Sequence, residues 1–149
     1  MLAELSLATA MVITTVIFHA VGLYAVARVL RLEEREEAVE HIHPMSLRGF
    51  SVTLGVILAL IALHGMEIWL YAIVYNLIGA VEGLRHAIYF STITYGAIGY
   101  DDSAMAEQWR LVSAIEGING VILMGWSTAF FVTLIARMRT ASSPGACSR

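Results

Sequence analysis

Three long apolar stretches dominate the chain, and shorter segments with polar or glycine residues separate them. The apolar stretches run from Leu5 to Leu30, from Gly49 to Tyr75 and from Leu111 to Ala136. A helix of about 20 mostly apolar residues is long enough to cross the hydrocarbon core of a bilayer. The pattern therefore predicts an all-α membrane protein with three transmembrane helices.

The segment between the first two spans, residues 31–48, is rich in Glu and Arg. It has no helix-breaking residue before Pro44, which favours an extension of the first helix. Its arginines, together with Arg137 and Arg139 after the third span, mark both segments as cytoplasmic by the positive-inside rule. We therefore expect a multi-pass protein of the cell (plasma) membrane, with the N-terminus outside and the C-terminus in the cytoplasm.

A fourth, shorter helix is predicted between the second and third spans. Residues 85–94 have room for about three helical turns, or roughly 15 Å, which is too short to cross a bilayer. A glycine-containing loop follows it. Non-helical backbone at membrane depth is tolerated only where it is buried in protein or lines water. A short re-entrant helix and its loop meet this condition when several copies of the chain surround a pore.

The loop carries the most specific motif in the chain. Residues 89–102 read Tyr-Phe-Ser-Thr-Ile-Thr-Tyr-Gly-Ala-Ile-Gly-Tyr-Asp-Asp. This segment resembles the pore helix and selectivity filter of the potassium-channel superfamily, whose signature reads roughly Thr-Thr-Val-Gly-Tyr-Gly-Asp. The resemblance covers about residues 50–138 and implies a bacterial two-helix-plus-pore channel with an extra N-terminal helix. Because the chain contains one such loop, the resemblance also implies a symmetric homotetramer in the lipid bilayer.

The resemblance divides the chain into four parts. These are a peripheral transmembrane helix (1–30), a cytoplasmic acidic connection (31–48), a pore domain (49–138) and a cytoplasmic tail (139–149). Within the pore domain we expect an outer helix, a pore helix (84–95), a filter (96–102) and an inner helix (108–138).

The resemblance assigns the ion path to backbone carbonyls of the loop. In such filters, rings of carbonyl oxygens replace the hydration shell of the ion. The ion-conducting residues would be Ala97, Ile98, Gly99, Tyr100 and Asp101. We expect an extended strand in which glycine helps to turn the carbonyls to one side. Ile98 would pack behind this strand.

Aromatic residues of the pore helix would support the filter from the side. Tyr100 would pack toward the pore helix of a neighbouring subunit, where Tyr89 and Phe90 form an aromatic cuff.

Two residues depart from the family signature. Ala97 stands where the family usually has Thr, and Asp101 stands where it usually has Gly. In a tetramer, Asp101 and Asp102 would place rings of carboxylates at the outer mouth, which concentrate cations. We expect passive conduction of potassium, with sodium or a divalent cation as alternatives, and neither a cofactor nor enzymatic activity. The same departures leave open a non-conducting or regulatory membrane subunit of this architecture.

Two pairs of polar residues lie inside the predicted spans. His64 and Glu67 are three residues apart and share a helix face. They form either a structural pair, completed by Arg85 or His86, or a proton or metal sensor.

Glu116 and Asn119 are also three apart, in the third span. They either face the cavity below the filter or, with Tyr89, support the filter from behind. His19 lies alone in the first span and is interpreted as a hydrogen-bonded packing residue.

Composition narrows the classes of function. Hydrophobic residues make up 58% of the chain and charged residues 14%, below the quarter or so that is typical of soluble domains. The net charge of −3 does not favour nucleic-acid binding. A single cysteine, Cys147, excludes an internal disulfide. A membrane metal-binding protein that uses His41 and His43 with the His64–Glu67 pair is a third alternative, although the expected topology separates these residues across the membrane.

Overall fold

The computed structural model describes residues 1–37, 47–99 and 102–141, and this part of the chain is helical without a β-strand. The prediction of an all-α protein is therefore confirmed. The helices are α1 (Leu2–Glu37), α2 (Leu47–Leu77), α3 (Leu84–Tyr95) and α4 (Arg110–Ala141), with short 3-10 turns at Asp102–Ala104 and Glu107–Trp109.

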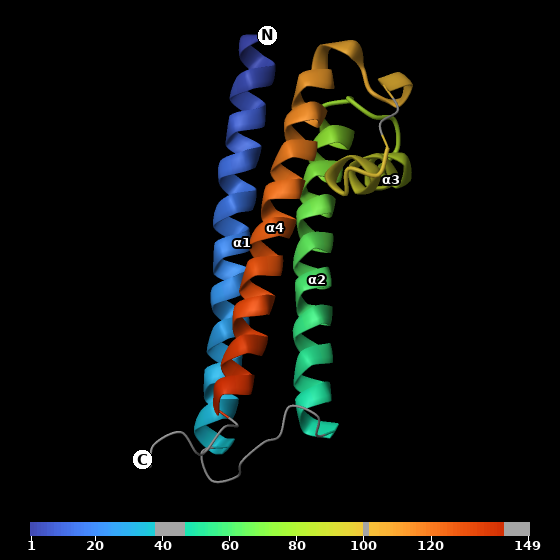
Figure 1. Ribbon diagram of the computed structural model, residues 1–149. Coiled ribbons are helices and arrows are strands. Elements are labelled where there is room, and N and C mark those ends of the chain that lie inside the picture. Colours follow the sequence, from blue (N-terminus) through green and yellow to red (C-terminus); the bar gives the residue numbers. More distant parts are fainter. Residues whose placement is uncertain (38–46, 100–101, 142–149) are drawn as a thin grey trace, which may run out of the picture.

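Three of these helices are long and apolar enough to cross a membrane, as the sequence predicted. The candidate spans are Leu2–Leu30, Gly49–Leu77 and Glu107–Ala136. In Figure 1, α1, α2 and α4 run side by side along the long axis of the molecule. The N-terminal end of α1 lies at the same end as α3, and the C-terminal end of α4 lies at the opposite end, near the end of α1.

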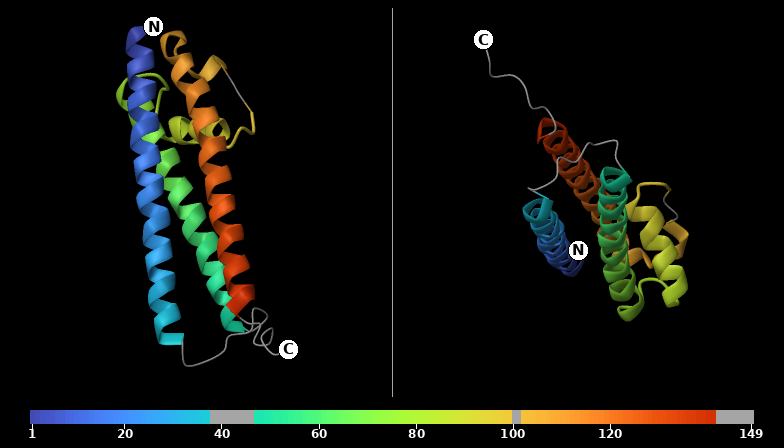
Figure 2. Two further views of the ribbon diagram at one scale, coloured as in Figure 1. Left: turned by 60° about the vertical axis from the view of Figure 1, so that its left-hand side comes forward. Right: turned by 90° about the horizontal axis from the view of Figure 1, so that it is seen from below.

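The short helix α3 lies across the long helices instead of along them (Figure 1). Its 12 residues are about 18 Å long, so it cannot span a bilayer. Seen from below in Figure 2, α3 lies on the far side of α2 and α4 from α1. It contacts both α2 and α4. α3 is therefore held at one end of the bundle by the two helices that precede and follow it in sequence.

One face of α3 is buried against α2. Residues three and four positions apart on a helix share a face. The buried residues of α3 follow this spacing and are Ala87, Phe90, Ser91, Thr94 and Tyr95. Of these, Ala87, Phe90 and Tyr95 belong to the main apolar core. The ring of Phe90 packs edge-on against the ring of Tyr75 in α2, with centroids 6.0 Å apart. The alternation of buried and exposed residues along α3 thus fixes which side of the short helix faces the bundle.

Two glycines of α4 allow the end of α3 to approach closely. A Cβ atom at Gly120 would lie 2.3 Å from the carbonyl oxygen of Tyr95, and one at Gly117 would lie 3.3 Å from the carbonyl oxygen of Thr94. Gly125 has no neighbouring atom within 4 Å of its Cβ position. Gly117 and Gly120 are therefore close-packing points, as small residues often are between membrane helices, and Gly125 is not.

The segments before and after α3 are tied together. Gly79 and Gly83, in the turn that leads from α2 to α3, have φ angles of 67° and 83°, which glycine adopts at little steric cost. Ala106, in the segment that follows the loop, donates its N–H to the carbonyl of Ala80, 2.9 Å away. This bond closes a frame around α3 and the loop that follows it.

Candidate functional site

The loop after α3 begins with a tight turn. Ala97 donates its N–H to the Thr94 carbonyl at 3.0 Å, and Ile98 donates to the Ile93 carbonyl at 2.9 Å. Ala97 has a φ angle of 51°, in the left-handed region. This combination is a Schellman motif, in which the left-handed position is usually a glycine. The expected extended strand is therefore not observed over residues 96–98, and Ala97, not Gly99, has the left-handed conformation.

The loop side chains are also placed differently from the expectation. Ile98 is 76% exposed, so in the single chain it does not pack behind a strand. Tyr89 is exposed, whereas Phe90 is buried against Tyr75, so the two rings do not form one cuff within the chain. The predictions for Tyr100, for Asp101 and for the side chain of Asp102 lie outside the described residues.

A groove lies beside this turn, between the end of α3, the loop and α4. Its volume is about 510 Å³. Its lining residues are Thr94, Ala97, Gly99, Ser113, Ala114, Gly117, Ile118, Val121 and Ile122. The Thr94 hydroxyl is buried and has no hydrogen-bond partner among the described residues. Within this same part of the chain, no backbone hydrogen bond uses the carbonyls of Ala97, Ile98 or Gly99.

Glu116 lies behind α3 and not in the groove. Its carboxylate accepts hydrogen bonds from the Tyr75 hydroxyl at 2.7 Å and from the Ser91 hydroxyl at 2.5 Å, and the whole residue is buried. The three residues come from α2, α3 and α4, so one carboxylate connects the short helix to both of its neighbours. A buried group that links three helices in this way suits a site that fixes α3.

Asn119 makes its contacts elsewhere. Its Nδ2 donates to the Thr15 hydroxyl of α1 at 2.8 Å and to the Tyr71 hydroxyl of α2 at 3.3 Å. Asn119 therefore joins α4 to α1 and α2, and these hydrogen bonds do not include α3.

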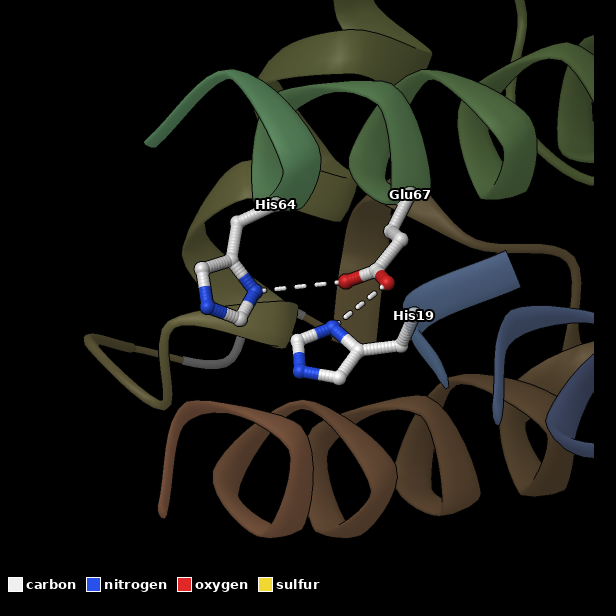
Figure 3. A group of neighbouring side chains, drawn as sticks. All are labelled: His19, His64 and Glu67. Carbon is white, nitrogen blue, oxygen red and sulfur yellow. Dashed lines mark hydrogen bonds and ion pairs between the residues drawn. The ribbon is translucent and has the colours of Figure 1, made fainter. Parts of the chain in front are cut away.

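A second buried polar cluster joins all four helices. The Glu67 carboxylate of α2 lies 2.9 Å from His19 Nδ1 of α1 and 3.2 Å from His64 Nδ1 (Figure 3). It also accepts a hydrogen bond from the hydroxyl of Tyr95, the last residue of α3. Ser127 Oγ of α4 lies 3.0 Å from His64 Nε2 and 3.3 Å from His19 Nε2.

This cluster corrects one interpretation made from the sequence and agrees with another. Arg85 and His86 are exposed and do not complete the His64–Glu67 pair. His19 is a buried, hydrogen-bonded residue, as expected. Its partner is Glu67, and its ring lies 5.2 Å from the ring of His64.

Sequence reasoning missed several hydroxyl groups that form hydrogen bonds with Glu67, Glu116 or Asn119. They are Thr15, Tyr71, Tyr75, Ser91 and Tyr95. A signal for part of this set is present in the sequence. Glu67, Tyr71 and Tyr75 recur every four residues in an otherwise apolar helix, and so place polar groups on one face.

Comparison with known families settles the class of the protein. A family model described as "Ion channel" matches residues 58–137, which is more than half of the 149-residue chain. The chain belongs to this ion channel family. The resemblance to the potassium-channel superfamily is thereby confirmed. No curated protein and no solved structure matches the chain.

The family match gives the two polar clusters a context. The matched region of this ion channel contains α3, its loop, Glu67 and Glu116, but it does not include α1. A helix outside the matched region of the channel therefore contributes His19 to the Glu67 cluster and Thr15 to the contacts of Asn119.

Proposed function

We propose that four copies of the chain assemble around an axis and conduct cations passively through the loop that follows α3. The observation that carries this proposal is the position of α3. It is a helix too short to span, it lies between two spans of a chain in the ion channel family, and it ends in a loop whose carbonyls are free of backbone hydrogen bonds in the described residues. Free carbonyls at such a position are suited to replace the hydration of an ion.

The exposed face of the single chain supports assembly. Ile118, Val121 and Ile122 line the groove, and each is at least half exposed. Ile98 of the loop is also exposed. The loop backbone cannot face lipid, because its polar groups would be unsatisfied there. Neighbouring copies that cover this face would enclose the loops around a water-filled axis.

The proposed ion path has an outer and an inner part. Asp101 and Asp102 attract cations to the outer mouth, and the carbonyls of Ala97, Ile98, Gly99 and Tyr100 bind the dehydrated ion. The Thr94 hydroxyl, which is buried without a partner and lines the groove with Ala97, supplies an oxygen at the inner end, where Ala97 lacks the hydroxyl of the family's usual Thr. Potassium is the expected ion, with sodium and divalent cations as competitors, and we place the loop on the outer side of the cell membrane.

Flux measurements on purified protein in liposomes test the proposal. Wild-type protein should dissipate a potassium gradient faster than empty vesicles, and Asp101→Asn with Asp102→Asn should lower the rate without changing the oligomer. Glu107→Gln is the matched control, because Glu107 is an exposed carboxylate that follows the loop. Equal flux from protein-containing and empty vesicles, over a range of ions and pH, would contradict conduction.

A non-conducting subunit of the same architecture is the second candidate. The turn at residues 96–98 favours it, because the carbonyls of a turn point in several directions instead of toward one axis. In that case the double variant Ala97→Thr with Asp101→Gly, which restores the family signature, should conduct where the wild type does not. Conduction by the wild-type protein rules this candidate out.

A further inference from the structure

The cluster around Glu67 has the composition of a metal site. His19 and Glu67 are completely buried, and the side chain of His64 is 17% exposed. One ligand atom from each of the three residues lies within 4.8 Å of the other two. Figure 3 shows that both Nδ1 atoms point toward the carboxylate, from two different helices. Two imidazoles and a carboxylate are a known ligand set for Zn²⁺.

The hydroxyl groups of Ser127 and Tyr95 lie beside this ligand set. Glu67, His19, Ser127 and His64 form a closed ring of four contacts, with two at the Nδ1 atoms and two at the Nε2 atoms. Each neutral imidazole carries one N–H and the serine carries one O–H, while an ionised carboxylate only accepts. These three protons leave the contact between His64 Nδ1 and Glu67 without a proton of its own, and the Tyr95 hydroxyl is within hydrogen-bond distance of both groups.

A metal ion between the Nδ1 atoms and the carboxylate would change this arrangement of protons. Both imidazole protons then reside on Nε2 and are donated to the two lone pairs of Ser127 Oγ. Histidines that bind a metal usually donate their second ring N–H to an oxygen in this way. The position of Ser127 between the two Nε2 atoms therefore suits metal-bound His19 and His64.

The distances bring the three ligands close to the spacing that a tetrahedral ion needs. Zinc bonds of about 2.0–2.2 Å place neighbouring ligand atoms roughly 3.3 Å apart. The Nδ1-to-carboxylate distances are 2.9 Å for His19 and 3.2 Å for His64, and one ligand atom from each of the three residues lies within 4.8 Å of the other two. The Tyr95 hydroxyl, 3.0 Å from His64 Nδ1, is the nearest fourth oxygen.

We propose that His19 Nδ1, His64 Nδ1 and the Glu67 carboxylate bind a divalent transition-metal ion of the zinc class, with the Tyr95 hydroxyl at the fourth position. The ion would fasten α1 to α2 and to the last residue of α3, directly before the loop. Metal binding would then stabilise the bundle and set the position of the end of α3. This proposal does not depend on whether the assembled protein conducts.

Zinc analysis of the purified full-length protein tests the site. After removal of metal with a chelator and titration with Zn²⁺, the wild type should retain about one zinc per chain, and its thermal unfolding temperature should rise. His19→Gln and Glu67→Gln should each lower zinc affinity by at least tenfold. The matched control is His86→Gln, because His86 is an exposed histidine of α3 outside the cluster, and it should bind zinc as the wild type does.

Ser127→Ala is a second test that does not depend on removing a ligand, because it keeps His19, His64 and Glu67. It should weaken zinc binding by about 10–100-fold, the usual cost of losing a group that orients a ligand. The proposal is overturned if the wild type binds less than stoichiometric zinc, or if His19→Gln and Glu67→Gln bind zinc as well as the wild type. It is also overturned if lowering the pH stabilises the protein and adding zinc does not.

Discussion

Replacement of Gly120 by alanine tests directly how α3 is seated. The new Cβ would lie 2.3 Å from the Tyr95 carbonyl oxygen and 2.9 Å from Tyr95 Cγ. Ordinary contacts begin near 3.4 Å, so the end of α3 must move by about 1 Å or the side chain of Tyr95 must be rearranged. Neither the side chain nor the backbone of Tyr95 can move freely. Its hydroxyl is hydrogen-bonded to Glu67, and its backbone precedes the turn at Ala97.

The expected loss of stability follows from this clash. Overpacking of a well-packed site costs about 1–3 kcal/mol. Alanine also gains up to about 1 kcal/mol over glycine in a helix interior, and this gain is shared by any Gly→Ala change in α4. Gly125→Ala is therefore the control, since its Cβ meets no atom within 4 Å. The difference in the free energy of unfolding between the two variants isolates the clash and should be about 1–3 kcal/mol.

Denaturant or thermal unfolding of the purified protein in detergent measures this difference. Gly117→Ala should fall between the other two, because its Cβ would lie 3.3 Å from the Thr94 carbonyl. In flux assays we expect the same order, with Gly120→Ala most impaired, since it displaces the end of α3. Equal stabilities for Gly120→Ala and Gly125→Ala would refute the packing of α3 on α4 at this point.

Three further changes test the remaining contacts. Glu116→Ala removes the acceptor of the Ser91 and Tyr75 hydroxyls and should cost about 1–3 kcal/mol in unfolding experiments, because these buried hydroxyls lose a partner. Additivity of this loss with that of Ser91→Ala would contradict a direct bond. Ala97→Gly should stabilise the turn by up to about 1 kcal/mol, because the φ angle of Ala97 is 51°, and Ala97→Thr should destabilise it. A higher unfolding temperature for Ala97→Thr than for Ala97→Gly would exclude this turn. Asn119→Ala should cost about 1–3 kcal/mol by leaving Thr15 without a donor, and it should loosen α1, detected as faster proteolysis within α1.

The buried polar residues show which contacts could be predicted from the sequence and which could not. The spacing of His64 and Glu67 predicted that they share a face, and they contact each other. The partner that completes the pair, His19, lies 48 residues from Glu67 in sequence, and no local rule connects them. Glu116 was left between two positions, and its contact with Ser91 across 25 residues places it behind α3.

The sequence by itself determined the three spans and the short helix with its loop, because the thickness of a bilayer and the length of an apolar run together decide what can cross. It did not determine the rotation of each long helix about its own axis. These helices are apolar on nearly every side, so periodicity does not reveal which side faces protein. Only the tertiary structure brought His19, Glu67 and Tyr95 together from three helices and turned the backbone after α3 at Ala97, since both depend on how the helices pack.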